Sequence, residues 1–416
     1  PSPVYGIGFK DNINTSTLII KDNDRGTVSI DNVSVTEGHS GTPTLTFTVS
    51  LSGDTQEPFK LYYETADGTA TTSDDDYVGV VNGELTINQL ASATNSISIT
   101  YKGDRKVEAD ETFRLILKSL EDKFSGHLTL HSTDHTGTAT IENDDSAIVR
   151  VTAIQGKEDP LNNQPAGYIF TLVDGLGNEV SSDQLVQINY QLGGTAQRTG
   201  LKADYTTLNP TTISIPAGSS SATVYFNVID DAILEISETI LLENLIVNGH
   251  YAGITLSTAP LPVARIEDND VAKISVSAVA SMLEGHENEQ DYVFTISLDK
   301  ETSENFVINY HTTNGTALSG EDYIGITNSQ GFTGTAGESY AVNVRIKGDH
   351  KVEPDEVFNF IVDGLTKTFE GRLTIETPSL AATITNDDST ELRITKQDGE
   401  EGVNHASFTF SLTNGK

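Results

Sequence analysis

Three acidic segments of this chain carry carboxylates at spacings that suit part of a calcium shell. Residues 102–111 read KGDRKVEADE, residues 347–356 repeat them as KGDHKVEPDE, and residues 229–238 form a looser copy, IDDAILEISE. In each copy three acids lie four and three residues apart. Calcium takes six to eight oxygen ligands, mostly from carboxylates and carbonyls. One segment supplies too few ligands, so acids from other loops must complete the shell.

Further acidic landmarks recur in step with these segments. An Asp-Tyr pair, a glutamate near the start of each unit and a terminal acidic cluster keep the same order. The pairs begin at Asp76, Asp204 and Asp322, and the glutamates are Glu37, Glu158, Glu284 and Glu401. The terminal clusters end at positions 24, 145, 270 and 388, which gives steps of 121, 125 and 118 residues. Each unit therefore has about the length of one ordinary domain.

The landmarks divide the chain into three whole units with a fragment at each end. The units cover residues 25–145, 146–270 and 271–388, of which the second is degenerate. Residues 1–24 match the close of a preceding unit, and residues 389–416 match the start of a further one, so we expect a slice of a longer array. No Gly- or Pro-rich linker separates the units. We therefore expect them to abut, with an acidic cluster at each joint.

Alternating apolar and polar residues predict β-strands throughout the chain. In residues 44–51, Leu45, Phe47 and Val49 share one face, while hydroxyl side chains cover the other. Thr, Val and Ile are abundant, and Asn-Gly turns separate the runs. No helical stripe of any length is present. About seven short strands per unit predict an all-β fold of antiparallel sandwiches.

The composition excludes several classes of function. The 416 residues include no Cys, and their formal net charge is −35. Absence of Cys rules out disulfides, a thiol nucleophile and thiolate metal sites, and it fits an extracellular bacterial protein. Strong acidity argues against nucleic-acid binding, because phosphate contacts need clustered Lys and Arg. No apolar run is long enough to span a membrane, and no nucleophile elbow or phosphate loop indicates an enzyme.

The ordered motifs resemble those of the Calx-beta family. In the first unit they are VTEG at 35–38, TADGTA at 65–70, the Asp-Tyr pair, the acidic segment and ATIENDD at 139–145. The third unit repeats this order well. The second is weaker, and Ser237 replaces an Asp of the acidic segment. The resemblance covers essentially the whole chain and implies tandem immunoglobulin-like sandwiches that bind calcium through loops at one end.

Carried over position by position, the resemblance implies one calcium site in each unit. The implied ligands are Glu37, Asp76, Asp104, Glu108, Glu111, Asp144 and Asp145 in the first unit; Glu158, Asp204, Asp231, Glu235, Glu238, Asp268 and Asp270 in the second; and Glu284, Asp322, Asp349, Glu353, Glu356, Asp387 and Asp388 in the third. Asn143, Asn269 and Asn386 stand where Asp is common in calcium-sensing members. Each Asn lowers the negative charge and leaves the number of ions per site open.

Electrostatics favours the same assignment. Seven carboxylates brought together without a cation would repel one another, and some would bind protons. Magnesium is less well suited, because it prefers a smaller octahedral shell and keeps its waters. The alternative is that the acids only solvate loop tips, which is the usual explanation of a single acidic loop. Three copies of the whole constellation in register favour calcium.

The leading hypothesis for function is a structural array in a cell-surface adhesin or extracellular filament, with Ca²⁺ at the domain junctions stiffening the rod. Its partners would be calcium, neighbouring repeats of the same chain, and other copies or a host or surface ligand. The rival is a regulatory calcium sensor like the module of sodium–calcium exchangers, and a third hypothesis is a spacer attached to an enzyme elsewhere in a longer chain. Affinity separates the first two, since sensors bind calcium at about 10⁻⁷–10⁻⁵ M and extracellular modules at about 10⁻⁴–10⁻³ M.

Overall fold

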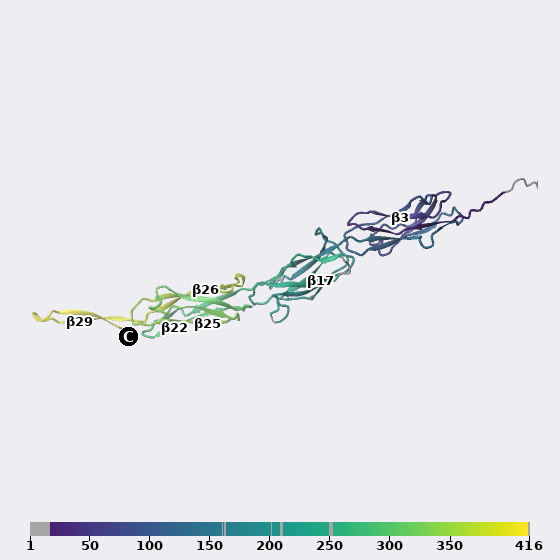
Figure 1. Cartoon of the computed structure of the whole chain (residues 1–416). Coiled ribbons are helices and arrows are strands. Elements are labelled where there is room, and N and C mark those ends of the chain that lie inside the picture. Colours follow the sequence, from purple (N-terminus) through teal and green to yellow (C-terminus); the bar gives the residue numbers. More distant parts are fainter. Residues whose placement is uncertain are drawn as a thin grey trace, which may run out of the picture.

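Three β-sandwiches follow one another in an extended row (Figure 1). The computed structural model describes residues 17–159, 161, 164–200, 202–208, 211–248 and 253–414. Within this part of the chain the regular structure is β-strand, apart from the short 3-10 turn η2 (Phe369–Gly371). The predicted all-β fold of tandem antiparallel sandwiches is confirmed. Of the expected opening fragment, residues 1–16 lie outside the described residues.

The first sandwich consists of a four-stranded sheet, ordered β6-β3-β1-β8, and a five-stranded sheet, ordered β2-β9-β7-β4-β5. Its strands are β1 (Gly26–Ile30), β2 (Val33–Thr36), β3 (Thr44–Leu51), β4 (Phe59–Ala66), β5 (Gly83–Ile87), β6 (Asn95–Thr100), β7 (Glu111–Leu120), β8 (Leu128–Leu130) and β9 (Thr136–Glu142). Strand β3 shows the predicted alternation, because Leu45, Phe47 and Val49 are buried and the residues between them are exposed. Phe47 meets Phe113 of β7 edge to face, so the core joins the two sheets.

The second and third sandwiches repeat this plan. The second is built from β10 (Ala147–Ile154), β11 (Gly156–Lys157), β12 (Ala166–Val173), β13 (Val186–Gly194), β14 (Tyr205–Thr206), β15 (Thr212–Ile215), β16 (Ser221–Val228), β17 (Glu238–Asn248), β18 (Ile254–Leu256) and β19 (Ala264–Glu267). The third is built from β20 (Ala272–Ala278), β21 (Ser281–Leu283), β22 (Glu289–Leu298), β23 (Phe306–Asn314), β24 (Thr327–Phe332), β25 (Ser339–Lys347), β26 (Glu356–Leu365), β27 (Leu373–Ile375) and β28 (Ser379–Thr385). A hairpin of β29 (Thr390–Gln397) and β30 (Ser407–Asn414) follows.

The strands are more numerous than the seven or so that the sequence predicts. One reason is that the opening segment of each sandwich crosses between sheets, and another is that a short strand (β8, β18 or β27) pairs in parallel with the first strand. β1 pairs with β3 and β8 in one sheet, and β2 pairs in parallel with β9 in the other. Two polar residues stabilise the crossing: the Asp31 carboxylate accepts from the Thr48 N–H, and the Asn32 side-chain oxygen accepts from the Thr138 N–H. Because β2 and β9 run parallel, Glu37 emerges beside the terminal acidic cluster.

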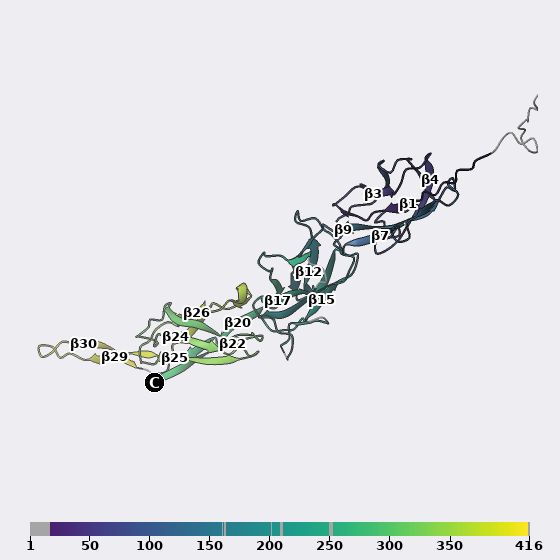
Figure 2. The same ribbon diagram turned by 45° about the vertical axis from the view of Figure 1, so that its right-hand side comes forward.

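The connections between sandwiches are too short to be flexible linkers. β9 ends at Glu142 and β10 begins at Ala147, while β19 ends at Glu267 and β20 begins at Ala272. The four residues between the strands at each joint include the terminal acidic cluster. Figure 2 shows the same end-to-end succession from a second direction. No helix of the described chain has the length and apolar character that crossing a membrane requires.

Candidate metal centres at the joints

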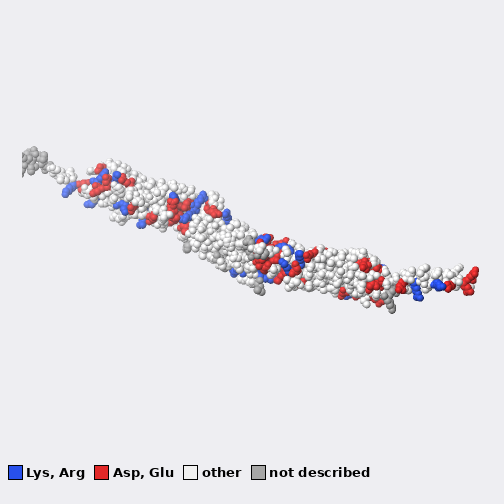
Figure 3. Space-filling view, turned by 180° about the vertical axis from the view of Figure 1, so that it is seen from behind, with Lys and Arg blue, Asp and Glu red and all other residues white. Residues whose placement is uncertain are grey.

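Acidic side chains gather in patches along the rod, separated by stretches of mostly uncharged surface (Figure 3). In the first sandwich the patch at the second-domain end is assembled from four places in the sequence. Glu37 follows β2, Asp76 lies between β4 and β5, residues 102–111 lead into β7, and the terminal cluster follows β9. The pairing of parallel strands therefore brings acids that are about a hundred residues apart to one end of the sandwich.

The glycine of the repeated KGD sequence permits a close approach of two loops. A Cβ atom on Gly103 would lie 2.1 Å from the carbonyl oxygen of Gly38, and one on Gly348 would lie 2.3 Å from that of Gly285. The backbone of the acidic segment therefore lies directly against the turn that follows the first glutamate. The Asp104 N–H also hydrogen-bonds to the Glu37 carboxylate, which fixes the two loops together.

The first cluster brings its predicted ligands together in two overlapping groups. One oxygen from each of Glu37, Asp104 and Glu108 lies within 4.8 Å of the other two, and the same holds for Asp76, Glu108 and Glu111. A cavity of about 10 Å³ is lined by Glu37, Asp76, Glu108 and Glu111, together with uncharged neighbours and Lys102. That volume is close to one water-sized sphere, so the cavity has room for one small occupant.

The two aspartates of the first terminal cluster complete the rim. The Asp144 Oδ1 atom accepts a hydrogen bond from the Gly38 N–H at 3.0 Å, and Asp145 lies close enough to Glu37 to raise its pKa. Asp110 is an acid of the segment that the prediction left out of the ligand set. Its carboxylate accepts from the Asn143 N–H at 3.1 Å and so holds the backbone of the terminal cluster.

Burial and mutual repulsion raise the pKa values of several carboxyl groups in the first cluster. Burial, followed by the charges of Asp104, Glu108 and Asp145, raises the pKa of Glu37 to about 8. Burial, followed by the charge and hydrogen bond of Asp76, raises the pKa of Glu111 to about 8. At neutral pH these groups need either a proton or a nearby cation. A divalent cation would let the cluster stay ionised.

Buried carboxylate oxygens without a hydrogen-bond partner provide an independent test of the fit to calcium. Within the described chain such oxygens occur in all three clusters: Asp145 Oδ2, Glu158 Oε2, Glu238 Oε2, Asp270 Oδ2 and Asp388 Oδ2. A buried polar atom that lacks a partner costs free energy. A bound cation with a preference for oxygen would satisfy these atoms, so the donor set fits Ca²⁺.

The second cluster also brings its seven predicted ligands together. One oxygen from each of Glu158, Asp268 and Asp270 lies within 4.8 Å of the other two, and all three residues are buried. Burial and then the charges of Asp268, Asp231 and Glu235 raise the pKa of Glu158 to about 8. Burial, followed by a hydrogen bond with Asp204, raises the pKa of Glu238 to about 9. Glu235 has its pKa raised to about 7 by burial and by Asp204.

Cations from the third sandwich reach into the second cluster, and sequence reasoning missed them. The Arg372 Nη1 atom lies 2.8 Å from Asp268 Oδ2, and its Nη2 donates to the carbonyl oxygen of Glu235 at 2.7 Å. Lys300 Nζ lies 3.1 Å from Asp270 Oδ1. The second cluster is therefore partly neutralised by the neighbouring domain.

The third cluster reproduces the geometry of the first. The Asp387 Oδ1 atom accepts from the Gly285 N–H at 3.1 Å, as Asp144 does from Gly38. Burial, followed by the charges of Asp349, Glu353, Asp388 and Asp322, raises the pKa of Glu284 to about 7. Burial and a hydrogen bond with Asp322 raise the pKa of Glu356 to about 7. All seven predicted residues of this unit thus lie at one end of the sandwich.

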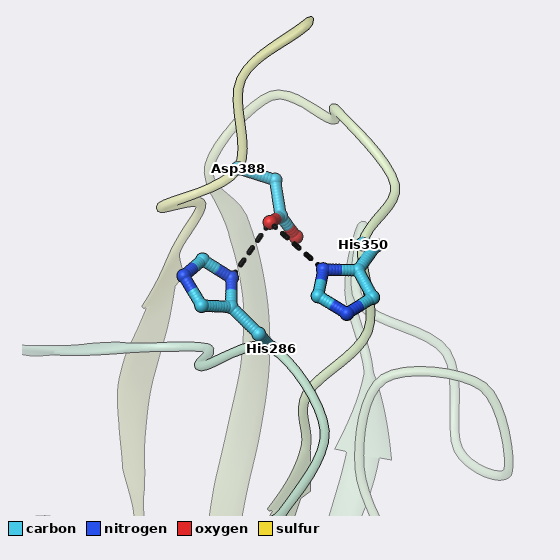
Figure 4. Close-up of side chains that lie close together, drawn as sticks. All are labelled: His286, His350 and Asp388. Atoms are coloured by element: carbon cyan, nitrogen blue, oxygen red, sulfur yellow. Dashed lines mark hydrogen bonds and ion pairs between the residues drawn. The ribbon is translucent and has the colours of Figure 1, made fainter. Parts of the chain in front are cut away.

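Histidines at the first and third clusters are further functional candidates that the sequence reasoning missed. His39 Nδ1 lies 2.7 Å from Asp145 Oδ1, and His286 Nδ1 lies 2.7 Å from Asp388 Oδ1. The signal was available, because both histidines follow the sequence Glu-Gly at the same place in the repeat. In the third cluster His350 joins the pair (Figure 4).

The loops that carry the carboxylates also insert an apolar side chain into the next sandwich. Val107 is fully buried in the core of the second sandwich, and its N–H donates to the Ser181 carbonyl at 2.8 Å. Leu234 is fully buried in the core of the third sandwich, and its N–H donates to the Glu301 carbonyl at 2.9 Å. Each of these joint plugs, as we call Val107 and Leu234, directly precedes a predicted metal ligand.

Comparisons with known proteins give the following matches. The apo form of the Calx CBD1 domain aligns at 16% identity over 28% of this chain and 99% of that one, with a TM-score of 0.25. The calcium binding domain CBD12 of CALX1.1 aligns at 14% identity over 58% and 99%, with a TM-score of 0.25. The titin fragment I67–I69 aligns at 10% identity over 88% and 100%, with a TM-score of 0.26. The family model described as the Calx-beta domain matches residues 21–153 and 267–389, which is more than half of the chain.

Proposed function

The chain belongs to the Calx-beta family, whose domains are calcium-binding modules, and from this premise we propose that it is a structural array that calcium stiffens at its joints. The first ion would be held by the carboxylates around Glu37, Asp76 and Glu108, with Asp144 and Asp145 at the rim. Calcium would supply positive charge and a flexible oxygen shell there. The equivalent acids of the second and third units would act in the same way.

The observation that carries this proposal is that one loop serves both the cluster and the joint. Glu108 faces the acidic cluster, while the adjacent Val107 lies in the core of the next sandwich. Glu235 and Leu234 repeat this arrangement at the second joint. An ion that orders the loop therefore also fixes the plug. Without the ion, repulsion among the carboxylates favours movement of the same loop.

The plug alone is too weak to keep a joint rigid. Full burial of a Val or Leu side chain contributes about 1.5–3 kcal/mol. A contribution of about 2 kcal/mol corresponds to a population ratio of roughly 30, so a joint held by the plug side chain alone would open a few per cent of the time. Ordering of the acidic loop by calcium adds to that free energy. The expected result is a rod that is stiff with calcium and bends at its joints without it.

An extracellular setting, in a cell-surface adhesin or filament, is the context that we propose for this rod. Lack of Cys and the net charge of −35 agree with a secreted protein that folds without disulfides and stays soluble. Several acidic clusters placed end to end suit a load-carrying array. A regulatory sensor instead needs one switch coupled to an effector, so the repetition favours the array.

Calcium titration into the metal-stripped chain by calorimetry, together with small-angle scattering, tests the proposal. Binding near 10⁻⁴–10⁻³ M with an increase in the maximum dimension supports a stiffened extracellular array. Binding near 10⁻⁷–10⁻⁵ M would favour the sensor. Absence of binding, or binding without a change in the scattering profile, would overturn the stiffening mechanism. Glu108→Gln should remove binding in the first unit and loosen the first joint only.

A further inference from the structure

We propose that the end of the third sandwich carries a second kind of metal site, for a divalent cation of the zinc class, formed by His286, His350 and Asp388. This site goes beyond the proposed calcium array, because nitrogen ligands select a different metal. Calcium prefers oxygen, whereas imidazole suits zinc, copper, nickel and iron. We take zinc as the probe, since two imidazoles and one carboxylate match its preferred donors.

One ligand atom from each of the three side chains lies within 4.8 Å of the other two. His286 Nδ1 lies 2.7 Å from Asp388 Oδ1, and His350 Nδ1 lies 3.7 Å from the same oxygen. The two rings lie nearly parallel, with centroids 5.4 Å apart (Figure 4). Zn–N and Zn–O bonds of about 2.0–2.1 Å place tetrahedral ligands about 3.3 Å apart. Both contacts to Asp388 therefore need only small shifts to accept the ion.

The Asp388 carboxylate has one oxygen for each kind of site: Oδ1 faces the two histidines, and Oδ2 remains for the calcium cluster. Asp388 is only 8% exposed, and its Oδ2 atom is buried without a hydrogen-bond partner. Neither histidine contacts this oxygen, since both interact with Oδ1. Contacts within the protein satisfy only one of the two oxygens of this buried carboxylate. A metal bound to Asp388 would offset the cost of burying it.

The surroundings of His350 match those of a metal-bound imidazole. While Nδ1 faces Asp388, Nε2 lies 3.3 Å from the Glu287 carboxylate. A histidine that binds a metal through one nitrogen commonly donates its other N–H to a carboxylate, which fixes the ring and raises its basicity. The Glu287 carboxylate thus assigns Nδ1 of His350 to the metal.

The other two clusters act as internal controls, because neither unites two histidines among its described residues. In the first cluster His39 takes the place of His286, but Arg105 occupies the position of His350 and forms an ion pair with Asp174 of the second sandwich. In the second cluster Lys300 lies beside Asp270, the counterpart of Asp388. The paired histidines are therefore a feature of the third unit and not a general consequence of the repeat.

Zinc titration into the complete chain by calorimetry at pH 7.5, with calcium saturating in one series and absent in the other, tests the site. The variants are His286→Gln, His350→Gln and the double variant, and His39→Gln is the matched control. These changes keep the charge of a neutral imidazole. We expect one zinc ion per chain in the wild type and in the control, roughly 10-fold or greater weakening in each single variant, and loss of this ion in the double variant. Cobalt(II) should give visible absorption bands that the double variant lacks.

Two outcomes would overturn the proposal: no zinc binding by the wild type, or a zinc isotherm that the double variant leaves unchanged. Thermal unfolding of each variant without metal checks that the fold is intact. Calcium titrations on the same samples keep the two proposals separate. Failure of calcium binding with zinc binding retained would count against the calcium array alone, while the reverse result would count against the histidine site alone.

Discussion

The joint between the first and second sandwiches and the joint between the second and third differ in the source of positive charge. At the second joint Arg372 and Lys300 of the third sandwich form ion pairs with Asp268 and Asp270. At the first joint the corresponding acids, Asp144 and Asp145, lie close to a single basic side chain of the described residues, His39 of their own sandwich. The second terminal cluster is therefore neutralised by cations of the next domain. At the first joint the permanent cations pair elsewhere, Lys106 with Glu108 of the acidic segment and Arg105 with Asp174 of the second sandwich.

One position in the sheet register accounts for most of this difference. Ala147 pairs with Ile254 in the second sandwich, and Ala272 pairs with Leu373 in the third. The residues that precede these partners are Gly253 and Arg372, so the side chain that neutralises the second cluster is absent at the first. A guanidinium group can replace part of the charge of an ion, but it cannot satisfy buried oxygens such as Glu158 Oε2. We therefore expect calcium at both joints and a stronger dependence on it at the first, where the terminal cluster has no guanidinium group beside it.

Removal of Arg372 should have the largest effect on stability, because the carboxylates of the second cluster then repel one another without its positive charge. Arg372→Ala leaves the buried Asp268 carboxylate without its partner, which costs about 3 kcal/mol in the calcium-free chain. Calcium should restore most of this loss. Urea unfolding with and without calcium measures it, and Arg345→Ala, which removes an exposed pair with Glu289, is the control with an effect under about 1 kcal/mol. If Arg372→Ala lowered the free energy of unfolding equally with and without calcium, arginine and calcium would not play the same role.

Truncation of the plugs should loosen the two joints separately. Leu234→Ala should weaken the second joint by about 2–3 kcal/mol and Val107→Ala the first by about 1–2 kcal/mol, because both side chains are fully buried in the neighbouring core. Spin labels on either side of each joint would report broader distance distributions. Val352 holds the same place in the third unit and is 49% exposed, so Val352→Ala serves as the control. A plug variant as stiff as the wild type would refute the shared-loop mechanism.

The sequence predicts the elements better than it predicts the joints. The alternation in residues 44–51 and the repeated acids are local patterns, so they indicated the strands and the acids that gather at each joint. Arg372 was missed because it lies 104 residues from Asp268 and belongs to a different sandwich. Val107, Leu234 and Val352 were a usable signal, since an apolar residue precedes the middle glutamate in every copy. Its meaning depends on contact with the next domain, which no single unit contains.

The calcium-free chain should lose stability as the pH rises. Glu37 and Glu111 have pKa values of about 8 in the folded chain, against an ordinary value of 4.5 that they regain on unfolding. The folded state therefore binds more protons between these values. The stability that these two groups contribute is fully present below about pH 4.5 and is lost as the pH rises through about 8. Glu238, with a pKa of about 9, should extend the loss at the second cluster to higher pH.

Thermal unfolding at pH 5.5, 7.0 and 8.5, with and without calcium, measures this dependence. Calcium should flatten the profile, because the cation replaces the protons that the cluster otherwise needs. A calcium-free melting temperature that rises from pH 5.5 to pH 8.5 would contradict the assignment of raised pKa values to the clusters.

The smallest expected effect comes from giving the first joint the arginine of the second. A Cβ atom at Gly253 would lie 3.1 Å from the Asp145 carbonyl oxygen and 3.4 Å from the Val107 side chain, so Gly253→Arg requires shifts of a few tenths of an ångström. Its guanidinium group would lie beside the first terminal cluster. We expect the substitution to stabilise the closed form of the calcium-free first joint by a net free energy of about 0.5–1 kcal/mol. The gain is small because a partly exposed ion pair offsets the strain only modestly. Gly253→Gln has a similar strain without the charge, and only the difference between the two variants, measured across the first joint in calcium-free buffer, reports the ion pair. If Arg and Gln give the same distance distribution, charge from the neighbouring domain does not substitute for calcium, and the contrast between the two joints has its origin in packing.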